Sequence, residues 1–436
     1  MEEDTAPKWL LEEDALIVIK NLLRFCALLP GKTKREILQR KITVNVILIL
    51  MIFTVIGAFI EAYNTRSNFM GFIQCGTVCI TLVKCLFKIW YTRFKEKDLR
   101  YLLDTLPRNF YVKDNVHQEK ILSTIRAKKK TAWILSVPYT SIFIFTIFLI
   151  ALDKMSSLTY RPPEGTIIVN GTSNASLFIR TLPLRIWLPL DEQKSPYYEI
   201  GYLYQLTIFT YQIYSTCVID ACIAVLVMYA SVQFELLAST IEHAKQNVKE
   251  LLEENAADGR QVLSGEVTDD EEPNIKDSKW RSEMDNYLKL CVKRHQALLE
   301  YIRRLNIISS PIELLQALTS SILICTLGFT AITSGNTAIL PKVILYTACA
   351  FLQIGLPCYC ATQLQTQSMA VAEAAYNCAW YEEPVSFQKS ISLILMRAQK
   401  PELIFVGPFG TMSLELFAGV AQSAYSYLTL LRQVYE

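Results

Sequence analysis

The last 26 residues place polar side chains at a regular helical spacing. Steps of 4, 3, 4, 3 and 4 residues separate Glu415, Gly419, Gln422, Ser426, Thr429 and Gln433. Such steps put these residues on one stripe of an α-helix. In a membrane this stripe must contact protein or water, because an unpaired polar group in lipid is costly. Two interpretations follow. Either the stripe packs against neighbouring helices, or several chains around an axis each contribute it to the wall of a pore.

Residues that could catalyse a reaction or bind a metal are scattered. The histidines lie far apart and lack metal-ligand spacing: His117, His243 and His295. Cys358 and Cys360 lie two apart in an apolar segment, where helical side chains point about 200° from each other. Gly31-Lys32-Thr33 ends like a phosphate-binding loop, but Cys26 occupies the position of its first glycine. We therefore expect no enzyme, no cofactor and no metal site.

The composition indicates a membrane protein. Of 436 residues, 52% are hydrophobic and 19% are charged, which is more apolar than a typical soluble domain. Lys and Arg number 43 against 41 Asp and Glu, a formal net charge of +2. This near balance gives no reason to expect a nucleic-acid partner.

Seven windows are apolar enough and long enough to cross a bilayer. A crossing takes about 20 residues, because a helix rises about 1.5 Å per residue through roughly 30 Å of hydrocarbon. The predicted spans are Ile42–Ile60, Phe69–Val83 (to Lys88 if Lys84 extends toward the surface), Thr131–Leu152, Ile200–Ala230, Leu314–Thr333, Val343–Ala361 and Thr411–Glu436. The last is the amphipathic span described above.

The distribution of basic residues predicts the orientation. Eight Lys and Arg residues precede the first span. Connections two, four and six contain eleven, eleven and three of them, whereas connections one, three and five contain one, five and none. The positive-inside rule therefore predicts a cytoplasmic N-terminus and an extracellular C-terminus. The chain's glycosylation sequons, at Asn170 and Asn174, fall in the predicted external connection 153–199. No cysteine lies in an external connection, which fits reduced thiols.

The expected fold is an all-α membrane protein with seven transmembrane helices and helical extensions that form a cytoplasmic anchor domain. Its predicted parts are a cytoplasmic amphipathic segment 1–41, spans one to four in 42–230, cytoplasmic helical extensions 231–313 with a disordered acidic linker 265–278, spans five and six in 314–361, a cytoplasmic anchor helix in 362–410, and a pore-lining span 411–436. The segment Trp9–Leu29 is predicted to be an amphipathic helix that lies in the membrane interface, and Ala374–Gln399 is a further amphipathic segment that ends before Pro401.

Two charged residues, Lys84 and Asp220, fall in the cytoplasmic halves of predicted spans. An intramembrane acid is expensive unless it is paired or hydrated. Two interpretations stay open: a direct pair between Lys84 and Asp220, or water and backbone partners for each.

Further motifs reveal a resemblance. They are the run His295-Gln-Ala-Leu-Leu-Glu-Tyr-Ile-Arg-Arg-Leu, the pair Ser310-Pro311 with Leu314, Leu315 and Gln316, and the ending Thr411-Met-Ser-Leu-Glu-Leu-Phe followed by Ser426-Tyr427-Leu428. With its seven spans and cytoplasmic N-terminus, the chain resembles an insect odorant receptor over its whole length. It is similar to the ligand-tuned kind, because the co-receptor has a longer fourth connection and a different C-terminal tail.

The resemblance implies a ligand-gated, non-selective cation channel in the plasma membrane of sensory neuron dendrites. Such receptors form a heterotetramer with the co-receptor, and their seventh helices line the pore. The family's pore motif then places a hydrophobic gate at Leu430 and a polar ring at Gln433, with Ser426 and Thr429 on the same polar stripe. The implied partners are the co-receptor, a small volatile odorant, permeant cations and membrane lipid.

The family's odorant pocket lies between spans two, three, four and six, toward the outer side. Residues expected at that depth are Phe143, Thr146, Ile147, Ile150, Thr207, Tyr211 and Tyr346. Such an apolar lining with a few hydroxyls suits a small volatile, although ordinary helix packing is the alternative for each residue. The alternative functions are a gustatory-type homomeric channel and an atypical G-protein-coupled receptor. The latter class has its N-terminus outside, opposite to the orientation predicted here.

Overall fold

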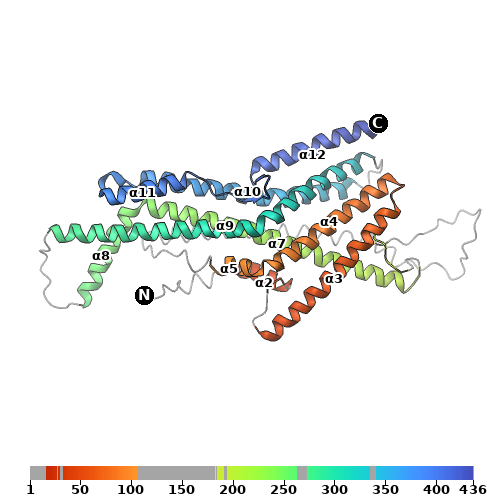
Figure 1. The fold of residues 1–436 in the computed structure, drawn as a ribbon, viewed down its shortest axis with the longest axis horizontal. Helices are drawn as coiled ribbons and strands as arrows, with labels where there is room; N and C mark the ends of the chain where they lie inside the picture. Colours follow the sequence, from red (N-terminus) through yellow and green to blue (C-terminus); the bar gives the residue numbers. More distant parts are fainter. Residues whose placement is uncertain are drawn as a thin grey trace, which may run out of the picture.

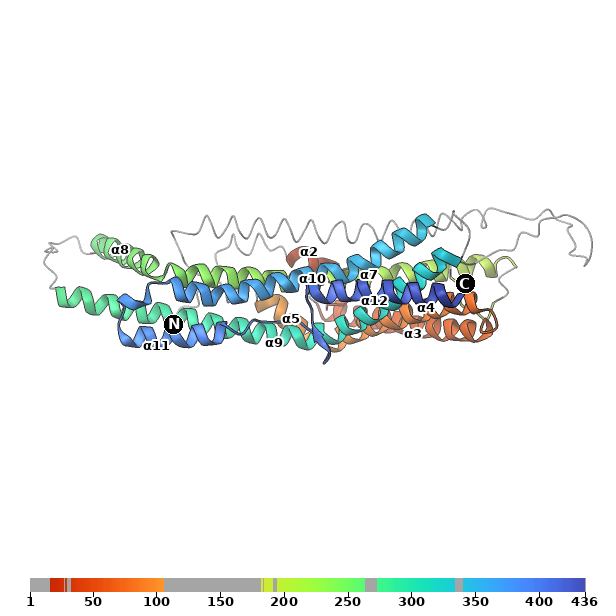
Figure 2. The same ribbon diagram turned by 90° about the horizontal axis from the view of Figure 1, so that it is seen from above.

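The computed structural model describes residues 16–26, 28–29, 33–105, 182, 184–190, 194–262, 273–333 and 340–435. They form an elongated bundle of helices, seen from two sides in Figures 1 and 2. The predicted third span, 131–152, and the sequons at Asn170 and Asn174 lie outside the described residues.

Three long helices run along the molecule and hold it together (Figure 1): α7 (Tyr197–Glu242), α9 (Pro273–Thr333) and α10 (Leu340–Asn377). At about 1.5 Å per residue, the 61 residues of α9 extend for about 92 Å, three times the hydrocarbon thickness. The predicted extensions of spans four and five are thus continuous with those spans. Helix α7 is apolar on all sides and buried over most of its length, because α10, α9, α4 and α2 pack around it.

Helices α3 (Lys34–Asn64) and α4 (Phe69–Phe94) form an antiparallel pair. Thr33 caps α3, since its hydroxyl accepts a hydrogen bond from the Glu36 amide, and Asn68 caps α4 through the Gly71 amide. Large apolar side chains of α3 remain exposed, among them Ile49 at 66%. A surface of this kind fits lipid better than water.

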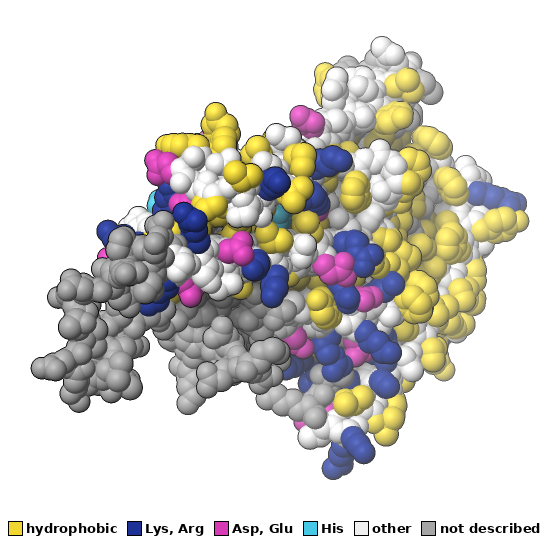
Figure 3. All heavy atoms as spheres, turned by 60° about the vertical axis from the view of Figure 1, so that its left-hand side comes forward, with side chains coloured by type: hydrophobic (Ala, Val, Ile, Leu, Met, Phe, Trp, Pro, Cys, Tyr) yellow, Lys and Arg dark blue, Asp and Glu magenta, His cyan; other side chains and the backbone are white. Residues whose placement is uncertain are grey.

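Within the described ranges, five helices are long and apolar enough to cross a membrane: Lys34–Asn64, Gly71–Phe94, Tyr197–Glu242, Ser278–Ile332 and Val343–Glu382. They include all or nearly all of predicted spans one, two, four, five and six. Figure 3 shows hydrophobic side chains gathered over one part of the surface and charged side chains over another. The molecule is therefore an all-α membrane protein with a charged helical end.

The N-terminal segment packs on protein. Helix α2 (Leu16–Phe25) lies against α7 and buries Leu23 completely in the main core. The Tyr211 hydroxyl of α7 donates to the Cys26 carbonyl at 2.9 Å. Ile19, Leu23 and Cys26, which belong to the predicted apolar side, are thus covered by the bundle rather than by the membrane interface.

The charged end contains α5 (Glu96–Thr105), α8 (Ala244–Val262), the 3-10 turn η2 (Trp380–Glu382) and α11 (Val385–Ala398). The amphipathic segment Ala374–Gln399 is divided between two helices, because α10 ends at Asn377 and α11 begins at Val385. Between them Ala379 adopts the left-handed conformation with φ 49°. Helix α9 begins at Pro273, so its first residues are helical where the acidic linker 265–278 was predicted. The rest of that linker lies outside the described residues.

A two-stranded antiparallel sheet, β1 (Phe405–Val406) and β2 (Gly410–Thr411), leads into the last helix, α12 (Leu414–Tyr435). Pro311 lies within α9 and lacks the amide that would bond the Ile307 carbonyl. The Tyr91 hydroxyl of α4 donates to that carbonyl at 2.8 Å. This hydrogen bond compensates the one lost at the proline.

Candidate ligand-binding cavity

A cavity of about 420 Å³ lies between α4, α7, α9 and α10. On α4 its lining runs from Ile73 to Cys85, about 18 Å of helix. Most of the lining is apolar, including Ile73, Val78, Leu82, Phe209, Ile213, Leu323, Leu327 and Val343. A volume within the usual range for small-molecule sites and a mainly apolar wall make it a candidate site for a small apolar ligand.

Threonine hydroxyls in the wall donate to their own helices. Thr77 and Thr81 of α4 donate to the carbonyls four residues before them at 2.8 and 2.6 Å, and Thr216 of α7 does so at 2.8 Å. Thr330 of α9 does the same at 2.8 Å. Their hydroxyl protons are therefore used within the protein, which leaves their lone pairs and methyl groups for a ligand.

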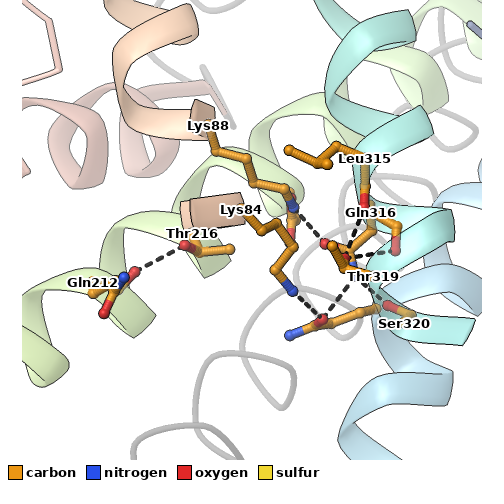
Figure 4. A network of polar contacts seen from close by, with 10 residues as sticks. Lys84, Lys88, Gln212, Thr216, Leu315, Gln316, Thr319 and Ser320 are labelled. Atoms are coloured by element: carbon orange, nitrogen blue, oxygen red, sulfur yellow. Dashed lines mark hydrogen bonds and ion pairs between the residues drawn. The ribbon is translucent and has the colours of Figure 1, made fainter. Parts of the chain in front are cut away.

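The base of the cavity is a buried polar network. Lys84 of α4 donates to Gln353 Oε1 of α10 at 3.3 Å, and Gln316 Nε2 of α9 donates to the same oxygen at 2.7 Å. Gln316 Oε1 accepts from Lys88 of α4 at 2.7 Å, and Lys88 also pairs with Asp220 of α7 at 2.5 Å. Figure 4 shows both lysines reaching toward the side that carries Gln316. The network thus joins four helices.

Of the two interpretations left open for Lys84 and Asp220, the direct pair is wrong, because Asp220 pairs with Lys88. The two lysines lie one helical turn apart on the same side of α4, so spacing alone allows either one to reach the acid. Lys88 is completely buried, although the sequence places it at the edge of its predicted span. Gln316 and Gln353 were not predicted as members of the network; the signal for them was the presence of glutamines in predicted apolar spans.

The predicted ligand residues lie in different places. Tyr346 of α10 lines the cavity. Thr207 is exposed, and Tyr211 bonds the Cys26 carbonyl instead, so α7 presents a different side, with Phe209, Gln212 and Ile213, to the cavity. Phe143, Thr146, Ile147 and Ile150 lie outside the described residues.

Helix α12 has its polar stripe turned away from the bundle. Leu416, Phe417 and Val420 pack against the main core, and Ala424 is buried against α9 and α10. The members of the stripe are all exposed: Glu415, Gly419, Gln422, Ser426, Thr429 and Gln433. Leu430 is 57% exposed. The stripe therefore has no packing partner within the described chain.

Comparison with known proteins agrees with this fold. The family model described as 7tm Odorant receptor matches residues 68–425. The chain therefore belongs to the 7tm odorant receptor family, which is a family of membrane receptors rather than enzymes.

Curated relatives match over part of their length. The chain is 35% identical to Odorant receptor Or2 of Anopheles gambiae, over 34% of this chain and 39% of that protein. It is 28% identical to Odorant receptor 30a of Drosophila melanogaster, over 59% of this chain and 60% of that protein. It thus spans between two fifths and three fifths of these two relatives. The Odorant receptor coreceptor of Anopheles gambiae is 20% identical over 78% of this chain and 76% of that protein.

Solved structures share the fold. The insect olfactory receptor OR5 from Machilis hrabei superposes with a TM-score of 0.78 at 18% identity, covering 98% of this chain and all of that one. The same receptor in complex with eugenol gives a TM-score of 0.76 at 18% identity, covering 98% of each chain. These likenesses show that the chain shares the fold of this receptor.

Proposed function

We propose that this chain is the ligand-tuned subunit of an odorant-gated, non-selective cation channel that assembles with a co-receptor in the plasma membrane. The observation that carries the proposal is the cavity between α4, α7, α9 and α10. Its mainly apolar wall gains affinity from burying apolar surface, at about 25 cal/mol per Å². An odorant receptor needs such a site within its membrane-spanning helices.

In this proposal, α12 lines the pore. A polar stripe that has no packing partner within the described chain suits a water-filled passage formed with other subunits. Leu430 then forms the hydrophobic constriction, and Gln433, Ser426 and Thr429 form the polar surface beside it. Phe417 packs over Gly355 of α10, so a shift of α10 at the cavity reaches α12 directly.

The proposed topology has seven spans, a cytoplasmic N-terminus and an extracellular C-terminus. The parts of α7 and α9 that extend beyond the membrane then form the cytoplasmic anchor. Asn170 and Asn174 carry glycans on the outside. An epitope after Glu436 tests this orientation. Staining of unpermeabilised cells is the expected result, and staining only after permeabilisation contradicts it.

The test of function is whole-cell current from this chain alone and with an insect co-receptor, across volatile esters, alcohols, aldehydes, acids and aromatics. We expect odorant-evoked cation current only when both chains are present. Current from this chain alone overturns the heteromeric assignment in favour of a self-sufficient channel. Second-messenger signalling without a direct current overturns the channel itself.

A further inference from the structure

The polar base of the cavity has a fixed direction of hydrogen bonding. The Lys88 ammonium can only donate, so Gln316 must present Oε1 to it and turn Nε2 toward Gln353. Gln353 must then present Oε1 to Gln316 Nε2 and also to the Lys84 ammonium. The orientations of both amides therefore follow from the two lysines, and the Gln353 NH₂ group is turned away from the network.

Donors remain unused at this end of the cavity. Among the described residues, the Lys84 ammonium has one acceptor, Gln353 Oε1, although an ammonium carries three N–H donors. No described residue accepts from Gln353 Nε2. Lys84 and Gln353 both line the cavity. Two donor groups thus lie side by side at one end of a cavity whose wall is mostly apolar.

The charges at this end are unevenly matched. Lys88 has the Asp220 carboxylate at 2.5 Å, whereas Lys84, only 3% exposed, has an uncharged amide oxygen at 3.3 Å. A buried ammonium with only a neutral partner favours an additional acceptor, and most of all an anionic one. Among the described residues, the hydrogen-bond acceptor of Lys84 is Gln353 Oε1, so a ligand in the cavity can supply a further one.

We propose that Lys84 and Gln353 together bind the terminal oxygen of the ligand, and that the cavity prefers a small aliphatic carboxylic acid over an equally long neutral carbonyl compound or hydrocarbon. The apolar body of the ligand lies along α4 toward Ile73, and its carboxylate lies at the base. Lys84 is thus a specificity-determining residue. The inference rests on the proposed function, because it takes this cavity as the odorant site.

The test is binding to the purified full-length chain in lipid nanodiscs, measured as ligand-dependent thermal stabilisation with hexanoic acid, hexanal and heptane. We expect half-saturating concentrations to rise in that order, with about tenfold or more between acid and alkane. Equal concentrations for the three ligands would overturn the proposal. This assay measures binding and needs no channel, so the two proposals can fail separately. A chain that prefers the acid but gives no current contradicts only the proposed function. A chain that gives current but has no acid preference contradicts only this inference.

Variants assign the preference to residues. Lys84→Met should weaken hexanoic acid about tenfold and leave heptane unchanged, whereas Lys84→Arg keeps the preference. Lys95→Met makes the same chemical change at the end of α4, outside the cavity, and should leave the ranking intact. If Lys84→Met fails to fold, Gln353→Glu provides Lys84 with an internal carboxylate and should abolish acid preference. Equal weakening of acid and alkane by either variant would indicate a packing role and reject the assignment.

Discussion

Lys88 of α4 and Asp220 of α7 form an ion pair of 2.5 Å with both side chains closed off from solvent, at 0% and 3% exposure. Removing one member of a buried pair leaves an uncompensated charge, which costs about 3–5 kcal/mol. We expect Asp220→Asn to lose most surface delivery and to lower the unfolding temperature of purified protein.

A double variant tests the pairing itself. Lys88→Met with Asp220→Leu removes both charges and should restore much of the delivery, although Gln316 Oε1 then loses its lysine donor. Lys84→Met with Asp220→Leu keeps Lys88 charged and should restore nothing. Restoration by the Lys84 combination instead would show that Asp220 pairs with Lys84 in the cell.

Gly57 of α3 allows a close backbone approach. A Cβ at this position would lie 2.4 Å from the Trp187 carbonyl oxygen, and the Trp187 amide donates to the Gly57 carbonyl at 3.2 Å. Gly57→Ala should therefore destabilise the protein by about 1–3 kcal/mol, the usual cost of an overpacked site. Gly76→Ala on α4 meets no atom within 4 Å and should be neutral or stabilising. Equal unfolding temperatures for the two variants would refute this difference.

His295, at the charged end of the molecule, makes the stability of the folded protein depend on pH. It lies on α9 about 28 Å of helix before the predicted span at Leu314, and its ring meets Phe234 of α7 edge to face at 6.2 Å. Desolvation by burial, followed by the nearby Arg397 charge, lowers the pKa of His295 from 6.5 to about 4. The folded state thus keeps His295 neutral where the unfolded chain binds a proton.

Because the folded pKa is the lower one, this contribution to stability is complete above about pH 6.5 and is lost as the pH falls toward 4. We expect the unfolding temperature to drop between pH 7 and pH 5, and to drop less in His295→Gln. His243→Gln, which removes a partly buried histidine at the end of α7, is the matched control for the loss of a histidine. An unchanged slope in His295→Gln would assign the effect to other groups.

Gln433 tests the pore assignment. If the polar stripe of α12 lines a cation pathway, Gln433→Glu adds negative charge to it and should raise the permeability of calcium relative to sodium. The measurement is the reversal potential of the odorant-evoked current in complexes with the co-receptor. Tyr425→Phe, at an exposed position on another side of α12, should leave the reversal potential unchanged. A Gln433→Glu channel with wild-type permeability would remove this residue from the pathway.

The sequence predicted well where one side of a helix differs chemically from the other. The stripe of α12 is such a case, and the structure separates it from the packed side with Phe417 and Val420. Helix α7 is apolar all round, so its sequence could not tell that Phe209 and Gln212, rather than Thr207 and Tyr211, face the cavity. Its rotation is set by neighbouring helices.

Other features depended on contacts between distant segments. The break between α10 and α11 requires a left-handed Ala379, a conformation that the residue type does not favour. The choice of Lys88 over Lys84 by Asp220 depends on where Gln316 and Gln353 lie on two further helices. Periodicity along one segment carries no information of this kind.

The uninterrupted course of α9 has a mechanical consequence. Pro311 divides it into about 57 Å toward Pro273 and about 33 Å toward Thr333. A stiff rod pivoting by 5° at this point sweeps the Thr333 end sideways by about 3 Å and the Pro273 end by about 5 Å. The Tyr91 hydroxyl holds the pivot from α4, the helix that also carries Lys84 and Lys88. A small rotation of α9 beside the cavity is thus converted into displacements of several ångströms at both ends of this helix.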